Sequence, residues 1–310
     1  MKIFRGENIR VAGSPVVTVG TFDGVHLGHR MLLARVVERA EAVKERSVVV
    51  TFDPHPAVVL GFMSENRMLL TSLEEKLLLL EESGVSATVV LDFNERLRQM
   101  ASCTFAEEIL CRGIGMRHLV AGFNNSFGNR DNTDSEDMEE CARRLGFSLE
   151  RVGSLKESRG ISVSSTLIRE ALLTGDIVGA NTLLGYTYFL RGVIVEGKKI
   201  GRSIGFPTAN ISSEYSYKLV PADGVYLVRV SFNGEEYVGM ANIGRRPTVS
   251  ATGEPRSVEV HIFDFAGSIY GQTVTLKFLE RMRDEMKFSS LDELKQQLER
   301  DSAAARRRLE

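Results

Sequence analysis

Residues 17–30 read VTVGTFDGVHLGHR and place two histidines among glycines directly after an apolar run. The run is typical of a buried strand, and the turn after it leads into an amphipathic stretch. Glycines let a backbone approach a ligand closely, and a new helix directs free N–H groups toward it. His26 and His29 are three residues apart, so within a helix they share one face and could each donate a hydrogen bond to a phosphate oxygen. The stretch predicts a phosphate cradle; a chance helix start or a pair of metal ligands is the alternative.

A second glycine-rich stretch, GKKIGRSIGFPTAN at residues 197–210, combines basic groups with oxygen-bearing side chains. Pro207 presets the backbone before Thr208 and Asn210, which could both face one magnesium ion or a phosphate. The order of residues is not that of a Walker loop, so the chemistry must follow another template. An ordinary loop with an Asx turn is the alternative.

The segment SVEVHIFDF, residues 257–265, alternates as a strand does and leaves Glu259 and His261 on the face opposite its aliphatic residues. A carboxylate there could accept the proton of a hydroxyl group that attacks a phosphorus atom. Taken alone, a carboxylate on a strand is more often a solvated side chain.

Three further segments carry polar groups close to the expected ends of strands or starts of helices. TFDPHP at residues 51–56 follows an apolar run, at the edge where open α/β sheets bind ligands. VSSTLIRE at residues 163–170 places three hydroxyls at a helix start and Arg169 one turn later, where they could hold phosphate oxygens and neutralise charge. A simple N-cap with a surface arginine is the alternative there. The third segment is GFNNSFG at residues 122–128.

Composition limits the possible functions. A chain of 310 residues with 43% hydrophobic content suits two domains. The net charge of -2 gives no global basic field for nucleic acid or anionic lipid, so phosphate binding must be local. No stretch resembles a signal peptide or a membrane span, which predicts a cytosolic protein. The cysteines at 103, 111 and 141 are odd in number and lack CxxC spacing, so we expect reduced thiols rather than disulfides or a zinc site.

The first half of the chain alternates short apolar runs with longer amphipathic ones, which predicts a parallel sheet with crossover helices. Strands are expected at Val16–Val19, Val48–Phe52, Thr88–Leu91 and Leu119–Ala121. Helices are expected from Gly28 to about Lys44, from near Ser72, and from near Thr133, where Glu136 could complete a capping box.

Beyond Ser164 the pattern changes. It predicts short helices at Thr166–Leu173 and Ile177–Leu184, a domain boundary near Gly185, and then strands at Tyr188–Val195, Gly224–Phe232, Glu236–Ile243, Ser257–Phe263 and Thr273–Phe278. The dipeptide Asn233-Gly234 indicates a hairpin. Five or six antiparallel strands in about a hundred residues favour a closed barrel, because closure removes exposed edges. A last helix is expected after Ser290, with Leu291, Leu294 and Leu298 facing the barrel.

These motifs, in this order and over nearly the whole chain, resemble those of the bifunctional bacterial riboflavin kinase/FMN adenylyltransferase (FAD synthetase) family. The HxGH spelling in its strand, turn and helix resembles the nucleotidyltransferase superfamily, and the PTAN stretch resembles the riboflavin kinase signature. NIGRRPTV at residues 242–249 and LERMRDEMKFSSLDEL at residues 279–294 resemble the remaining kinase signatures. The resemblance implies a doubly wound, Rossmann-like α/β domain at 1–184 and a six-stranded Greek-key barrel with a C-terminal helix at 185–310.

The resemblance also implies two reactions with ATP. Riboflavin activated by Glu259 receives the γ-phosphoryl group to give FMN, and FMN then attacks a second ATP, with His26, His29 and Arg169 stabilising the charge, to give FAD and pyrophosphate. Magnesium accompanies ATP, held in the kinase by Thr208 and Asn210, and no tightly bound metal is expected. Other ATP contacts fall on Gly20, Phe22, Asp23, Gly24, Gly28, Asn124, Ser164, Ser165, Thr166, Gly201 and Arg202. Flavin contacts fall on Phe52, Asp53, Pro54, His55, Pro56, Phe127 and Arg283.

One segment departs from the family pattern. Asn125 stands where the family has an aromatic residue, so the flavin or adenine contact of GFNNSFG is expected to be weaker. Two rivals stay open: a chain with a degenerate adenylyltransferase half would make FMN without FAD, and a sensor would bind flavin without consuming ATP. No nucleic-acid or membrane partner is expected. The sequence does not indicate whether the protein is a monomer or an oligomer.

Overall fold

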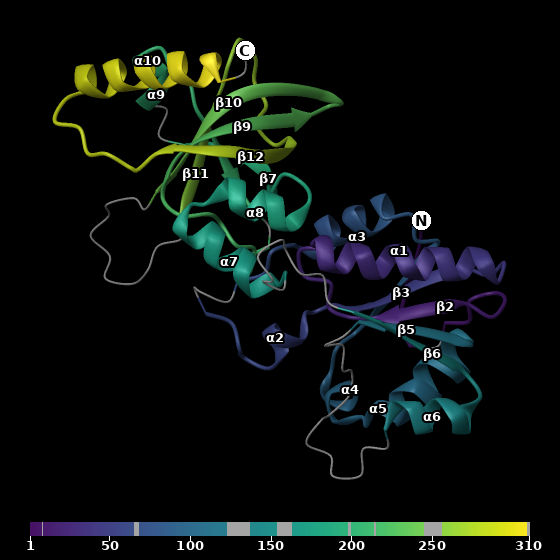
Figure 1. Cartoon of the computed structure of the whole chain (residues 1–310). Coiled ribbons are helices and arrows are strands. Elements are labelled where there is room, and N and C mark those ends of the chain that lie inside the picture. Colours follow the sequence, from purple (N-terminus) through teal and green to yellow (C-terminus); the bar gives the residue numbers. More distant parts are fainter. Residues whose placement is uncertain are drawn as a thin grey trace. The chain divides into compact units, whose positions relative to one another are not determined.

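The computed structural model describes residues 1–7, 9–64, 68–122, 137–153, 163–197, 200–213, 215–244 and 256–308. The chain forms two compact units, Met1–Ser165 and Thr166–Glu310 (Figure 1). The predicted site residues Asn124 and Phe127 and the predicted helix start at Thr133 lie outside the described residues.

A parallel six-stranded sheet forms the centre of the first unit, in the order β1-β4-β3-β2-β5-β6. The strands are β1 (Lys2–Arg5), β2 (Val16–Val19), β3 (Ser47–Phe52), β4 (Ala87–Leu91), β5 (His118–Gly122) and β6 (Ser148–Val152). β2, β3 and β4 are buried along their whole length, as strands covered on both faces are. The four predicted strands are confirmed, whereas the partly exposed edge strands β1 and β6 were not predicted.

Helices cover both faces of this sheet (Figure 1). α1 (Leu27–Ala42) and α3 (Leu73–Glu82) lie on one face, and α4 (Glu95–Gln99), α5 (Ser102–Phe105) and α6 (Met138–Leu145) lie on the other. The short α2 (Pro56–Val59) and the π-helical η2 (Ala106–Ile114) complete the unit. α3 begins after Ser72, as predicted, because Ser72 and Glu75 form a capping box.

The order of the strands reverses at β2. The chain runs from β2 through β3 to β4 on one side, and β5 and β6 extend the sheet on the other. Open parallel sheets bind ligands outside the carboxyl ends of their strands at such a point. The glycine-rich turn that follows β2 therefore lies where sheets of this kind bind ligands.

The prediction that all cysteines are reduced thiols is wrong. Cys103 and Cys141 form a disulfide between α5 and α6, with their Cα atoms 5.8 Å apart, whereas Cys111 is free. The two partners are separated by 38 positions in the sequence, and it is the packing of α6 against α5 that brings them within bonding distance. Spacing along the chain carried no sign of this pairing.

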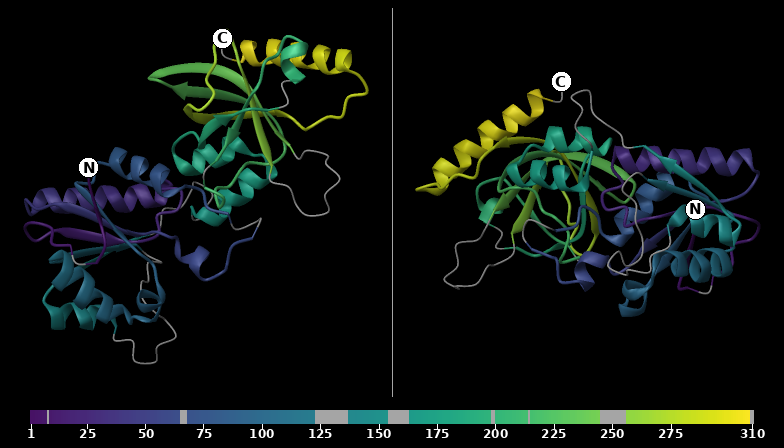
Figure 2. Two further views of the ribbon diagram at one scale, coloured as in Figure 1. Left: turned by 180° about the vertical axis from the view of Figure 1, so that it is seen from behind. Right: turned by 60° about the horizontal axis from the view of Figure 1, so that its bottom comes forward.

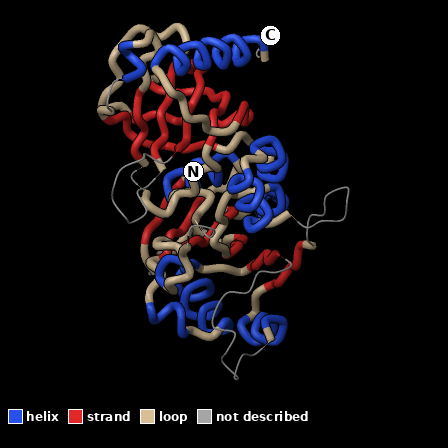
Figure 3. Tube along the Cα trace, turned by 90° about the vertical axis from the view of Figure 1, so that its left-hand side faces the viewer, coloured by secondary structure: helices blue, strands red, loops and turns tan. Residues whose placement is uncertain are grey.

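Six antiparallel strands close into a barrel in the second unit, in the order β10-β11-β8-β7-β12-β9 (Figure 3). They are β7 (Phe189–Val195), β8 (Ala209–Ser212), β9 (Gly224–Phe232), β10 (Glu235–Gly244), β11 (Ser257–Ile262) and β12 (Thr273–Arg283). The five predicted strands and the closure are confirmed, and β8 is the strand that the sequence reading missed. Asn233 and Gly234, with φ of 51° and 82°, form the predicted two-residue hairpin turn.

Four helices accompany the barrel: α7 (Ser165–Thr174), which starts at the boundary, α8 (Ile177–Leu184), α9 (Ile200–Ser203) and α10 (Leu291–Arg307). α10 runs along the outside of the barrel (Figure 2). The prediction that Leu291 faces the barrel is wrong, since 54% of its surface is exposed. The helix instead docks through buried Ala305 and through Asp301, which binds Arg283 of β12. Within the described residues, no helix is both long and apolar enough to cross a membrane.

The disulfide can be tested by counting thiols. When the protein is purified without reductant, denatured and alkylated, we expect one modified cysteine, Cys111, in mass spectrometry of the peptides. After reduction all three should be modified. Alkylation of Cys103 and Cys141 without prior reduction would contradict the disulfide.

Candidate active sites

The turn between β2 and α1 is held in a left-handed conformation that few side chains adopt. Phe22 has a φ of 48° and Gly24 a φ of 82°. Phe22 is buried, its ring meets the imidazole of His29 edge-on at 5.2 Å, and Gly20 leaves room for it, because a Cβ there would lie 3.1 Å from the ring. Phe22 and Gly20 thus shape the turn from within.

The carboxylate of Asp23 anchors the same turn. It is 3% exposed and accepts hydrogen bonds from the backbone N–H groups of Leu70 at 2.9 Å and Thr71 at 3.1 Å. In return, the N–H of Gly24 donates to the Thr71 hydroxyl at 3.2 Å. Asp23 therefore fixes the shape of the turn through these hydrogen bonds.

His26 and His29 lie together, as their spacing predicted. Their rings stack with centroids 3.7 Å apart, and Gly28 leaves space for His26, since a Cβ there would lie 3.2 Å from its ring. His26 caps α1 by accepting the backbone N–H of His29 at Nδ1, which leaves Nε2 as the site of its proton when neutral.

The surroundings of His29 disfavour its charged form. Burial lowers the pKa of His29 well below its ordinary value, and the neighbouring His26 and Lys76 lower it further. Its Nδ1 is buried and has no hydrogen-bond partner in the part of the chain that the structure describes. A neutral imidazole offers one donor and one acceptor, so His29 suits hydrogen bonding to a ligand.

The start of the VSSTLIRE segment reaches this turn. The hydroxyl of Ser165 donates to the backbone oxygen of Asp23 at 2.9 Å, and the Val163 oxygen would lie 3.8 Å from a Cβ on Gly28. Two predicted motifs far apart in the sequence are thereby brought together. Thr166 and Arg169 continue along α7 within the second compact unit.

The TFDPHP segment divides between core and surface. Phe52 is buried in the hydrophobic core, where its ring meets that of Phe93 at 5.6 Å. Asp53 lies 3.9 Å from Arg5, and the Nδ1 of His55 accepts the backbone N–H of Ala57 and so caps α2. Of the predicted flavin contacts in this segment, the residues after Phe52 are the accessible ones.

In the barrel, strand pairing brings the predicted kinase residues together. Glu259 on β11 is directly opposite Asn210 on β8, and the Thr208 hydroxyl lies 3.5 Å from the Glu259 carboxylate, at the outer limit of a hydrogen bond. On the same face, the His261 ring contacts the Pro207 oxygen at 2.8 Å. The predicted alternation of β11 is confirmed, with Val258, Val260 and Ile262 buried.

Two glycines make room for this arrangement. A Cβ on Gly197 would lie 2.0 Å from the Asn210 amide nitrogen, and one on Gly201 would lie 2.1 Å from the Phe206 backbone oxygen. Real Cβ atoms do not approach other atoms so closely. A side chain at position 201 would therefore collide with backbone, and one at position 197 would displace the Asn210 amide. Gly197 lets its backbone pack against the Asn210 side chain, and Gly201 lets its backbone pack next to Thr208.

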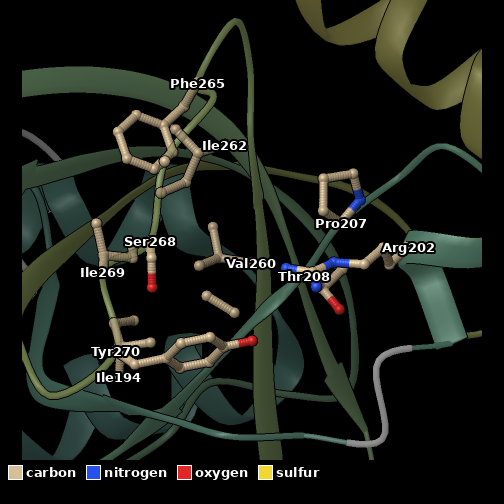
Figure 4. A pocket seen from close by; sticks show the side chains of 12 residues that line it. Ile194, Arg202, Pro207, Thr208, Val260, Ile262, Phe265, Ser268, Ile269 and Tyr270 are labelled. Carbon is tan, nitrogen blue, oxygen red and sulfur yellow. The ribbon is translucent and has the colours of Figure 1, made fainter.

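A cavity opens beside Thr208 (Figure 4). It encloses about 470 Å³ of space, part of it open to solvent, and aliphatic and aromatic side chains line most of it. Arg202, Pro207 and Thr208 lie on one side, and Ser268 and Ile269 on the other. The cavity therefore combines aliphatic and aromatic lining residues with the polar groups of Arg202, Thr208 and Ser268.

Comparisons with known proteins identify a family for each half of the chain. A family model described as FAD synthetase matches residues 9–167, and one described as riboflavin kinase matches residues 184–309. The bifunctional riboflavin kinase/FMN adenylyltransferase of Bacillus subtilis is 38% identical over 94% of this chain and 91% of the relative. The enzyme of the same name from Haemophilus influenzae is 36% identical over 99% of this chain and 98% of the relative.

The chain belongs to the bifunctional riboflavin kinase/FMN adenylyltransferase family. The expected family, its two activities and the order of its two domains are confirmed. A solved structure from Streptococcus pneumoniae, described as a macrolide-efflux protein, matches with a TM-score of 0.88 and 32% identity over 99% of both chains. That likeness supports the fold of this family member.

The kinase half contains a donor set that fits magnesium. Thr208 and Asn210 contribute a hydroxyl and an amide oxygen beside the Glu259 carboxylate, and Mg²⁺ binds through few protein oxygens together with nucleotide phosphates. The guanidinium of Arg283, whose flavin contact stays a prediction, binds the Asp301 carboxylate, and the closest distance between nitrogen and oxygen is 2.7 Å. It fixes α10 to β12.

The sequence reading missed one charged residue of the adenylyltransferase half. Lys76 of α3 is 3% exposed and donates from Nζ to the Thr51 hydroxyl at 3.3 Å. Burial lowers its pKa to about 8, although Asp23 and Asp53 act in the opposite direction. The signal was present, because Lys76 stands three and four residues before the buried Leu79 and Leu80, in the core-facing stripe of its helix.

Changing Gly197 to alanine tests the geometry around Asn210. We expect riboflavin phosphorylation to fall by about 10²-fold, because a misplacement of about 1 Å has that effect on a catalytic group. Adenylylation of supplied FMN should be unchanged in steady-state assays. Gly153→Ala, where a Cβ meets nothing within 4 Å, is the matched control. Full kinase activity in Gly197→Ala would contradict the role given to this glycine.

Proposed function

We propose that Glu259 is the general base of riboflavin phosphorylation. The observation that supports this most directly is the convergence of Glu259, Thr208 and Asn210 on one face of the barrel. The 5′-hydroxyl oxygen of riboflavin forms a bond to the γ-phosphorus of ATP, the bond from that phosphorus to the bridging oxygen breaks, and ADP leaves. Glu259 takes the hydroxyl proton. A base in this position contributes typically about 10²–10⁴-fold to the rate.

The cavity beside Thr208 would form part of the ATP site. Arg202 and Thr208 both line it. The Thr208 hydroxyl also lies 3.5 Å from the Glu259 carboxylate, so phosphates bound at Thr208 would lie near the proposed base. Magnesium bound with ATP would be held through Thr208 and Asn210, and when bound it neutralises phosphate charge. Gly201 lies next to Thr208, and its lack of a side chain allows the backbone to pack closely there.

In the α/β half, FMN receives the adenylyl group. A phosphate oxygen of FMN forms a bond to the α-phosphorus of ATP, and the bond to the pyrophosphate oxygen breaks. A phosphate monoester is largely dianionic at neutral pH, so the attacking oxygen has no proton to lose. The site therefore needs donors rather than a base, and the His26 Nε2 proton and a neutral His29 meet that need.

Further contacts complete the proposal for this half. The turn with Gly20, Gly24 and Gly28 would hold the ATP phosphates, together with the hydroxyls of Ser164, Ser165 and Thr166 and the charge of Arg169. Asp53, Pro54, His55 and Pro56, at the carboxyl end of β3, would contact the flavin. Asn124 and Phe127 stay predictions.

We place the boundary between the two functions at residues 184 and 185. Residue 184 is where the riboflavin kinase match begins, and Gly185 ends α8 in the left-handed conformation. The cytosolic location stays a prediction, supported by the need of both reactions for ATP.

Replacing Glu259 by glutamine tests the base. Formation of FMN from riboflavin should fall by about 10²–10⁴-fold, because the amide cannot accept the proton. Formation of FAD from supplied FMN should not change. Both products are followed by chromatography over time, with Glu299→Gln on exposed α10 as the matched control. Wild-type kinase rates in Glu259→Gln would rule out Glu259 as the base.

Replacing His29 by asparagine tests the other half. We expect FAD formation from supplied FMN to fall by about 10²-fold, the effect of removing one donor from a developing charge, while FMN formation from riboflavin persists. His118→Asn, at the start of β5, is the matched control. A wild-type protein that makes FMN but no FAD would instead favour the rival in which the adenylyltransferase half is degenerate.

A further inference from the structure

Lys76 is a buried cation that the fold alone does not explain. Its side chain is 3% exposed, and among the described residues its hydrogen-bond partner is the Thr51 hydroxyl. An ammonium group has three N–H donors and loses much hydration on burial, so a single neutral partner compensates it poorly. An apolar side chain would suit this position of α3 better if stability were the only requirement.

The hydrogen bond of Lys76 leads to the glycine-rich turn. Its Nζ lies 3.3 Å from the Thr51 hydroxyl oxygen, and that hydroxyl donates its own proton to the Thr21 backbone oxygen at 3.2 Å. Thr21 follows Gly20 and opens the turn that ends at His26. The chain of two bonds therefore connects α3, through the carboxyl end of β3, to the backbone of the phosphate cradle.

The charge of Lys76 also acts on His29. It is one of the causes that lower the pKa of His29, after burial and His26. The other charged groups that face Lys76 are Asp23 in the turn and Asp53 after β3, and both favour its ammonium form. On its own helix, Glu75 is engaged in the capping box with Ser72. In surroundings of low dielectric such charges interact strongly.

We propose that Lys76 is a positioning residue of adenylyl transfer: its ammonium group holds Thr51 and Thr21 in place and adds positive charge near the turn that would bind the nucleotide phosphates. Arrival of ATP then offsets the burial of the ammonium further, because the phosphates add negative charge to that of Asp23 and Asp53. The inference rests on the proposed function of the α/β half.

The test compares Lys76→Met, which removes the charge, with Lys76→Arg, which keeps it, in the full chain. In Lys76→Met, kcat/KM for ATP in FMN adenylylation should fall by about 10- to 100-fold, the range seen when a group that orients a ligand-binding residue is removed. Riboflavin phosphorylation by the same chain is the internal control and should not change. Lys2→Met, on exposed β1, is the matched control variant.

The pH profile separates this role from a structural one. In the wild type, kcat/KM for ATP should fall as the pH rises through about 8, because Lys76 then loses its proton. Lys76→Arg should lack this alkaline limb, since a guanidinium stays protonated throughout the alkaline range. Lys76→Met should lack it as well, at a lower rate.

Nuclear magnetic resonance of the ring-labelled histidines gives a readout without turnover. Because Lys76 lowers the pKa of His29, the pKa should rise in Lys76→Met and stay low in Lys76→Arg. Wild-type adenylylation and an unshifted His29 titration in Lys76→Met would overturn the proposal. If Lys76→Met does not fold, Lys76→Arg still tests the proposal. A fall of kcat/KM for ATP above about pH 8 that persists in Lys76→Arg would overturn it. A wild type that forms no FAD would instead refute the proposed function.

Discussion

The turn after β2 depends on the buried carboxylate of Asp23. This carboxylate accepts hydrogen bonds from the N–H groups of Leu70 and Thr71, and without them its charge would be costly to bury. The same hydrogen bonds hold the backbone of Phe22 and Gly24 in the left-handed conformation. The same turn supplies the oxygen that Ser165 binds and the start of the helix that His26 caps. A single carboxylate thus fixes the backbone on which the adenylyltransferase residues stand.

The barrel reaches a comparable result through strand register. Glu259 meets Asn210 because β11 and β8 pair at that point, and a slip of one residue would turn Glu259 into the barrel interior. Gly201 packs against the Phe206 backbone oxygen, and Gly197 packs against the Asn210 amide, so a side chain at either position would disturb the segment before β8. In the barrel, strand register and close packing fix the positions of the polar side chains, as the buried carboxylate fixes the backbone of the turn in the first unit.

The sequence predicted what local patterns determine. Fully buried strands such as β3, the capped start of α3 and the Asn233-Gly234 turn each carry their own signal, and the alternation of β11 placed Glu259 correctly. Features that arise from packing between distant segments had no such signal. The disulfide of Cys103 and Cys141, the exposure of Leu291 and the engagement of Arg283 by Asp301 are of this second kind. Phe52 belongs with them, because only the fold shows that its ring lies in the core.

The division of the chain into two compact units has a consequence for cellular supply. Because both units are translated as one polypeptide, the two catalysts are always produced in equal number. Changes in gene expression therefore raise or lower FMN and FAD capacity together. The balance between the two coenzymes must then be set by the relative affinities and turnover of the two sites.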